Sequence, residues 1–288
     1  MLSRFVVWPA LSGTVFLAAG LVAVRRQFLV ASRLDRVIVL GPVFVAAPLA
    51  LFGAEHVVAA QFVMQAVPAW MPARLFWAYF VGTALLATAT SFVLMKQVRA
   101  SSTLFGIMLL LFVLLMHLPN AASNTTDPFA WTVAVRDLAF GGGAWALAGT
   151  QTKEWRLHGT SRLITFGRVI MAVAVVFFGV EHTLHPEFAP GVPLRKLTPP
   201  WIPAPLLWGY LTGAVLVIVG ACLLVTRHAR AAAAWLGIIM ALLTLFIYLP
   251  MLSMTAQSSE IVEGLNYVAD TLLFGGTALL LAGALPKT

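Results

Sequence analysis

Residues 37–58 read VIVLGPVFVAAPLALFGAEHVV, an apolar stretch whose only charged or imidazole side chains, Glu55 and His56, stand near its end. A helix rises 1.5 Å per residue, so about 20 residues cross a hydrocarbon core about 30 Å thick. Similar stretches recur along the 288 residues, of which 61% are hydrophobic and only 10% charged. Soluble domains carry about 25% charged residues, so this composition excludes a water-soluble globule. The sequence predicts a multi-pass membrane protein.

Nine apolar runs are long enough to span the bilayer. They are apolar all round rather than alternating, and lipid offers no partner for backbone N–H and C=O groups. We therefore expect an all-α protein of about nine transmembrane helices and not a β-barrel. The expected spans lie near residues 5–24, 37–58, 76–95, 102–119, 130–149, 163–185, 206–226, 231–250 and 263–285.

The basic residues predict the orientation of the chain. A net charge of +8 could indicate nucleic acid in a soluble protein, but here the charges fall between apolar runs, so no nucleic-acid partner is expected. Cytoplasmic loops of membrane proteins carry the excess of Lys and Arg. An N-terminus outside and a C-terminus in the cytoplasm, in the cell membrane, puts most of the 18 basic residues inside. These are Arg25, Arg26, Arg33, Arg36, Lys96, Arg99, Lys153, Arg156, Arg162, Arg227, Arg230 and Lys287.

The first run has a second interpretation as a cleaved signal peptide ending at Leu21-Val22-Ala23. Cleavage would deliver the basic residues 25–36 to the outside, so we favour a retained span. The single cysteine, Cys222, lies inside an apolar run and offers neither a disulfide partner nor a zinc-ligand spacing.

An internal duplication organises the rest of the chain. FGAEH at residues 52–56 returns as FGVEH at 178–182, HLP at 117–119 as YLP at 248–250, and FGG at 140–142 as FGG at 274–276. Each copy has four expected spans, an even number, so both copies enter the membrane in the same orientation. We expect an N-terminal helix and basic loop at 1–36, a first repeat at 37–150 and a second at 160–286.

Each half resembles the DoxX-like family of four-helix membrane proteins. The resemblance rests on Gly53 to His56, the basic turn from Lys96 to Arg99, His117, and RDLAFGG at 136–142. It implies two parallel four-helix bundles, packed side by side behind one leading helix. It also implies a link to membrane redox chemistry of quinones, thiosulfate or other substrates, with a quinone as one candidate ligand or cofactor and membrane redox proteins as candidate partners beside the lipid bilayer.

Ionisable residues within the spans mark the candidate site, because each costs about 2.5–3.5 kcal/mol at a span centre on insertion scales. We expect Glu55 and Glu181 to face His117 or Tyr248 and the last span of a repeat, with Glu55 as the partner of Arg136. Under the expected topology these groups gather at the outer side. The candidates for ligand binding or proton relay are Glu55, His56, His117, Arg136, Asp137, Glu181, His182, Tyr248 and Asp270.

Three functions stay open for this cluster. It could hold a quinone or other small hydrophobic molecule, line the path of a transporter or channel, or fix helix register in a structural subunit of a membrane complex. The sequence does not decide whether the protein is an enzyme. His182 and His185 share a helix face but have no matching pair in the first repeat, so they are weak metal candidates and no metal is expected.

Overall fold

The computed structural model describes residues 3–192, 194–255 and 257–287, and it is all-α. Within these residues, eight helical segments are long and apolar enough to cross a bilayer, which confirms eight of the nine expected spans. They are formed by α1 (Arg4–Val30), α2 and α3 (Leu34–Ile38 and Gly41–Val58), α5 (Arg74–Leu94), α6 and α7 (Val98–Phe112 and Leu118–Ser123), α10 (Arg162–Leu184), α11 (Pro205–Leu224), α12 and α13 (Thr226–Leu243 and Leu249–Ser253), and α14 (Ser258–Ala284).

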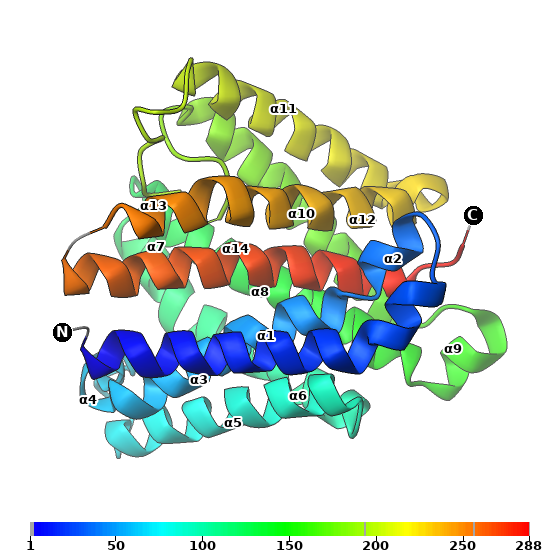
Figure 1. Ribbon diagram of the computed structural model, residues 1–288, viewed down its shortest axis with the longest axis horizontal. Helices are drawn as coiled ribbons and strands as arrows, with labels where there is room; N and C mark the ends of the chain where they lie inside the picture. The colour runs from blue at the N-terminus through cyan, green and yellow to red at the C-terminus, as the bar shows by residue number, and fades with distance from the viewer. Residues whose placement is uncertain (1–2, 193, 256, 288) are drawn as a thin grey trace.

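The ninth expected span is helix α8 (Pro128–Thr150), which is long enough to cross but less apolar than the others. Arg136, Asp137 and three consecutive glycines lower its hydropathy, and most of its residues are buried by other helices. The helix begins where Asp127 caps it by accepting a hydrogen bond from the Phe129 N–H at 3.0 Å. It links α7 to α9 (Lys153–His158), and Figure 1 places these two helices at opposite ends of the molecule.

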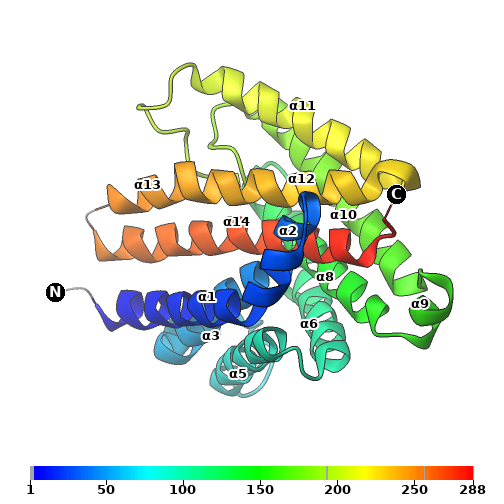
Figure 2. The same cartoon turned by 45° about the vertical axis from the view of Figure 1, so that its right-hand side comes forward.

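Two helices form the centre of the molecule. Helix α14 packs on α3, α8 and α12, while α8 packs on α6, α10 and α14. On the outside of the bundle, α5 packs on α3 and α11 packs on α10. Helix α1 also covers α3. Figures 1 and 2 show α14 running through the middle of the bundle, with the N- and C-termini at opposite ends.

This packing differs from the expected pair of self-contained bundles. The first helix of each half, α3 or α10, packs extensively on the last helix of the other half, α14 or α8. Glycines permit this close approach. A Cβ atom at Gly142 would lie 2.9 Å from the Gly167 carbonyl oxygen, and one at Gly143 would lie 2.4 Å from Thr277 Cβ. The two halves therefore interleave through their central helices.

Helices α6 and α12 both widen into a π-helical turn near the same end of the bundle. The turns are Val113–His117 and Thr244–Tyr248, and each is followed by Leu-Pro. Proline cannot donate a backbone hydrogen bond, and its ring clashes with the carbonyl four residues earlier, so the helix adjusts around it. The last residue of each turn, His117 or Tyr248, stands where the local helical register changes.

Candidate functional site

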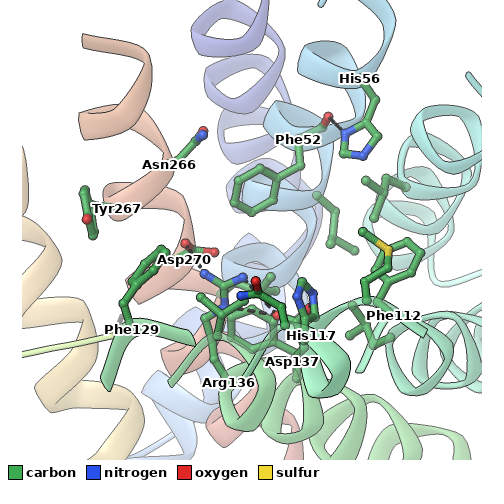
Figure 3. A pocket seen from close by; sticks show the side chains of 18 of the residues that line it. Phe52, His56, Phe112, His117, Phe129, Arg136, Asp137, Asn266, Tyr267 and Asp270 are labelled. Atoms are coloured by element: carbon green, nitrogen blue, oxygen red, sulfur yellow. Dashed lines mark hydrogen bonds and ion pairs between the residues drawn. The ribbon is translucent and has the colours of Figure 1, made fainter. Parts of the chain in front are cut away.

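An ion network joins α8 to α14 and to the π-helical turn after α6. The Arg136 guanidinium donates to Asp137 Oδ1 through Nε at 3.0 Å and to Asp270 Oδ2 through Nη1 at 2.6 Å. Asp137 Oδ2 lies 3.0 Å from His117 Nε2. The side chains of Arg136, Asp137 and Asp270 are at most 14% exposed. Figure 3 shows the four groups converging on one another.

This geometry brings four of the predicted site residues together and corrects one expectation. Glu55 was expected to pair with Arg136, but its Oε1 accepts a hydrogen bond from Asn266 Nδ2 at 3.3 Å. Neighbouring residues on a helix point about 100° apart. The long Arg136 side chain nevertheless reaches back to Asp137 while it also reaches across to Asp270.

The network forms one wall of a cavity of about 510 Å³. Polar residues of the cavity also include His56, Asn266 and Tyr267, and apolar side chains from α3, α5 and α6 complete it. The aromatic rings of Phe52 and Phe129 stand beside the polar groups in Figure 3. The arrangement combines convergent hydrogen-bonding groups with an apolar surface, as ligand sites usually do.

His56 lies across the cavity from Arg136 (Figure 3). Its Nδ1 lies 2.8 Å from the backbone oxygen of Phe52, one helical turn earlier. A carbonyl oxygen can only accept, so Nδ1 carries a proton and donates it. Among the described residues Nε2 has no hydrogen-bond partner, and in the neutral imidazole it is an acceptor directed at the cavity side.

The remaining predicted residues lie in the second half and do not line this cavity. His182 is fully buried, with Nε2 3.2 Å from the Gly191 carbonyl oxygen and 3.3 Å from its nitrogen. Tyr248 is buried and its ring stacks on Tyr267 with centroids 6.0 Å apart. Glu181 was expected to face Tyr248, but the structure places its carboxylate 3.9 Å from His185 Nε2.

The two histidines considered for a metal contact different groups. His182 contacts Gly191, whereas His185 lies 3.9 Å from Glu181 and 3.7 Å from Glu187. Across the described parts of the chain, no group of three or more His, Cys, Asp and Glu side chains is arranged to hold a metal ion.

Sequence reasoning missed several polar residues at one end of the cavity. Glu263, Asn266 and Tyr267 line it from α14 together with Asp270. Their spacing of three, four and seven residues places them on one helix face, which is a signal the sequence contains. Lys196, from the segment between α10 and α11, forms an ion pair with Glu263 at 2.7 Å. Nothing local in the sequence indicates that this segment reaches α14.

A second cavity, of about 580 Å³, lies between α5 and α6 and is lined mainly by apolar side chains. It shares Phe105, Phe112 and Met116 with the polar cavity. Leu104 and Leu111 also line it and are exposed at 63% and 46%, so it opens on the outer, apolar surface of the bundle. The two cavities adjoin through these three shared side chains.

Comparisons with protein-family models, curated proteins and solved structures find no match to this chain. No family is therefore assigned, and the function has to be argued from the cavities and the residues around them.

Proposed function

We propose that this membrane protein binds a small amphipathic molecule, with a quinone as the favoured class. The polar head would lie in the charged cavity and the apolar tail in the groove between α5 and α6. One observation carries the proposal: a charged cavity of about 510 Å³ and an apolar cavity of about 580 Å³ adjoin through Phe105, Phe112 and Met116. Both volumes fall in the usual range of about 300–1,000 Å³ for small-molecule sites.

The charge balance of the network supports a role beyond fixing helix register. Arg136 faces two carboxylates, Asp137 and Asp270, so these three groups alone leave one negative charge away from water. Isolated charge in such a place is costly. A ligand that donates a hydrogen bond to one of these carboxylates offsets part of that excess charge. A head group that exchanges protons, as quinones do on reduction, suits this environment.

The apolar groove supports a ligand with a tail. Phe105, Phe112 and Met116 belong to both cavities, so a chain attached to a head near His117 can continue past them between α5 and α6. The exposed Leu104 and Leu111 at the outer side make the groove continuous with the surface that lipid would cover. A ligand would enter from the bilayer, where hydrophobic molecules are concentrated.

We also propose that the chain has a duplicated, DoxX-like organisation, with repeats at 37–150 and 160–286 that follow a leading helix at 1–36. In this proposal the N-terminus lies outside and the C-terminus in the cytoplasm. In support, Arg230 and Lys287 both pair with Asp35, so two basic residues from distant parts of the chain meet one carboxylate at one end of the bundle. His56, His117 and Asp270 line the cavity toward the other end, which this orientation places outside.

The test compares two Val→Trp variants in native lipid discs. Val133 lines the polar cavity, whereas Val173 on α10 is 61% exposed. Mass spectrometry of the organic extract should find about one quinone-like amphiphile per wild-type chain, enriched over lipid from empty discs. Forcing a larger side chain into space that another group must occupy costs about 1–3 kcal/mol. Val133→Trp should therefore lower the affinity of the protein for the amphiphile about 5- to 150-fold.

The control variant Val173→Trp should retain the molecule at the wild-type level. Both variants must elute as folded protein and unfold at comparable temperatures, so that loss of ligand cannot be confused with loss of fold. If the wild-type extract contains bulk lipid only, or Val133→Trp retains as much amphiphile as Val173→Trp, the cavity is not the binding site.

A further inference from the structure

The proline-rich segment between α10 and α11 inserts into the second half of the molecule. Its two arms are bridged by the Ala189 N–H, which donates to the Lys196 oxygen at 2.7 Å, and Ala189 and Val192 are at most 1% exposed. Gly191 contacts His182, and the Val192 oxygen accepts a hydrogen bond from Thr271 Oγ1 at 3.2 Å. The outer part of this segment is visible at the upper left of Figure 1.

Gly191 is the residue that allows this insertion. Its φ of 139° is a conformation that side-chain-bearing residues rarely adopt. A Cβ atom there would also lie 2.6 Å from the Tyr248 hydroxyl oxygen. The backbone of Gly191 and Val192 therefore fills the space between His182, Tyr248 and Thr271.

The sequence repeat relates these three residues to three residues of the open cavity. The FGxEH motifs align His182 with His56, and the Leu-Pro motifs align Tyr248 with His117. The FGG motifs, 134 residues apart, align Asp270 with Arg136 and hence Thr271 with Asp137.

Contacts between α8 and α14 support this alignment. Arg136 bonds to Asp270, 134 residues away, and the Phe140 ring packs on Phe274 with centroids 6.1 Å apart. Contacts between equivalent positions are what a two-fold relation between two units produces.

The first half lacks such an insertion. Its corresponding connection contains the short helix α4 (Ala60–Val63) and a 3₁₀ turn (Met64–Ala66), and no residue from 59 to 73 lines the polar cavity. Instead, His56, His117 and Asp137 line open space there. The second half thus contains a filled counterpart of the first half's site.

We infer that the chain has one ligand site of this kind, the cavity beside His56, His117 and Asp137, and that the ligand there donates a hydrogen bond to His56 Nε2. The inference rests on the proposed function, since it names the chemistry of the same ligand. The donor is an O–H or N–H on the polar head, as in a phenol or a quinol. It occupies the place that the Gly191 backbone takes beside His182. The place beside His182 and Thr271 takes no ligand because the backbone of Gly191 and Val192 already occupies it.

The test uses 4-decylphenol and 4-decylanisole, which differ only in that a methyl group replaces the donated hydrogen. Equilibrium dialysis between protein-loaded and empty lipid discs measures binding, and native mass spectrometry counts bound molecules. One hydrogen bond contributes about 0.5–1.5 kcal/mol, so wild type should bind the phenol about 2- to 12-fold more tightly, with one molecule per chain.

Two histidine variants separate the role of His56 from general effects. His56→Leu should bind both probes equally, because the acceptor is lost and the cavity remains. His158→Leu, at an exposed position on α9, should keep the wild-type preference.

The wild-type measurements decide the inference even if His56→Leu fails to fold. Equal binding of phenol and anisole by wild type overturns the donor assignment while leaving the binding function intact. Two phenols per chain overturn the single site. Binding of neither probe, in a chain whose extract also contains no amphiphile, contradicts the proposed function itself.

Discussion

Replacing Arg136 by Met tests whether the buried ion network holds α8 against α14. The guanidinium lies 2.6 Å from Asp270 and 3.0 Å from Asp137, and the three side chains are 14%, 10% and 7% exposed. Removing the cation leaves two carboxylates facing each other out of water, and breaking a buried pair in this way costs about 3–5 kcal/mol. We expect Arg136→Met to lower the free energy of unfolding by that amount. Reversible unfolding in mixed micelles of increasing SDS fraction measures it.

Lys287→Met is the matched control. Lys287 Nζ lies 2.6 Å from Asp35, the same distance as in the Arg136–Asp270 pair, but its side chain is 76% exposed. Exposed pairs contribute about 0–1 kcal/mol, so this change should alter stability little. Arg136→Met/Asp270→Asn should recover about 0.5–3 kcal/mol relative to Arg136→Met, because one uncompensated charge is gone. A cost for Arg136→Met no larger than that for Lys287→Met would refute the reasoning.

Two further predictions concern the central helices. Gly143→Ala should cost about 1–3 kcal/mol in the same unfolding assay, because its Cβ would lie 2.4 Å from Thr277 Cβ, whereas Gly141→Ala, whose nearest neighbour is 3.5 Å away, should be tolerated. Equal losses of stability in the two variants would show that α8 and α14 can move apart to accommodate the added methyl group. In a Cys222→Ala chain, Thr126→Cys should react with an impermeant maleimide in intact cells and Gln151→Cys only after lysis. Labelling of both from one side would mean that α8 does not cross the membrane.

Sequence reasoning predicted the helices and their apolar faces because hydropathy is a local property. It placed His117 near Asp137, since each stands at the end of a span on the same side of the membrane. It failed for the partner of Arg136, because that pairing depends on which helix from a distant part of the chain lies alongside α8. Asp270 on α14 faces that position, whereas Glu55 on α3 is turned toward Asn266.

The filled counterpart of the cavity could not be predicted for a similar reason. The prolines between α10 and α11 indicate a connection without regular helix, but not where it lies. Its position depends on Gly191 passing Tyr248 and on Lys196 reaching Glu263, and both partners come from other helices. Hydrogen bonds between segments 67 and 79 residues apart leave no local pattern in the sequence.

The contact between Arg136 and Asp270 gives a physical reason why the two halves carry different residues at this position. On the proposed alignment, Arg136 and Asp270 are equivalent residues that meet where α8 and α14 face each other. If both copies carried Arg there, two buried guanidinium groups would repel each other in a medium of low dielectric. Asp in one copy turns that repulsion into an ion pair, but it also makes the two halves electrostatically different. The guanidinium of Arg136 then stands beside Asp137 and His117 at the open cavity, whereas His182 contacts the Gly191 backbone. The ion pair at this interface thus fits the single ligand site that we propose.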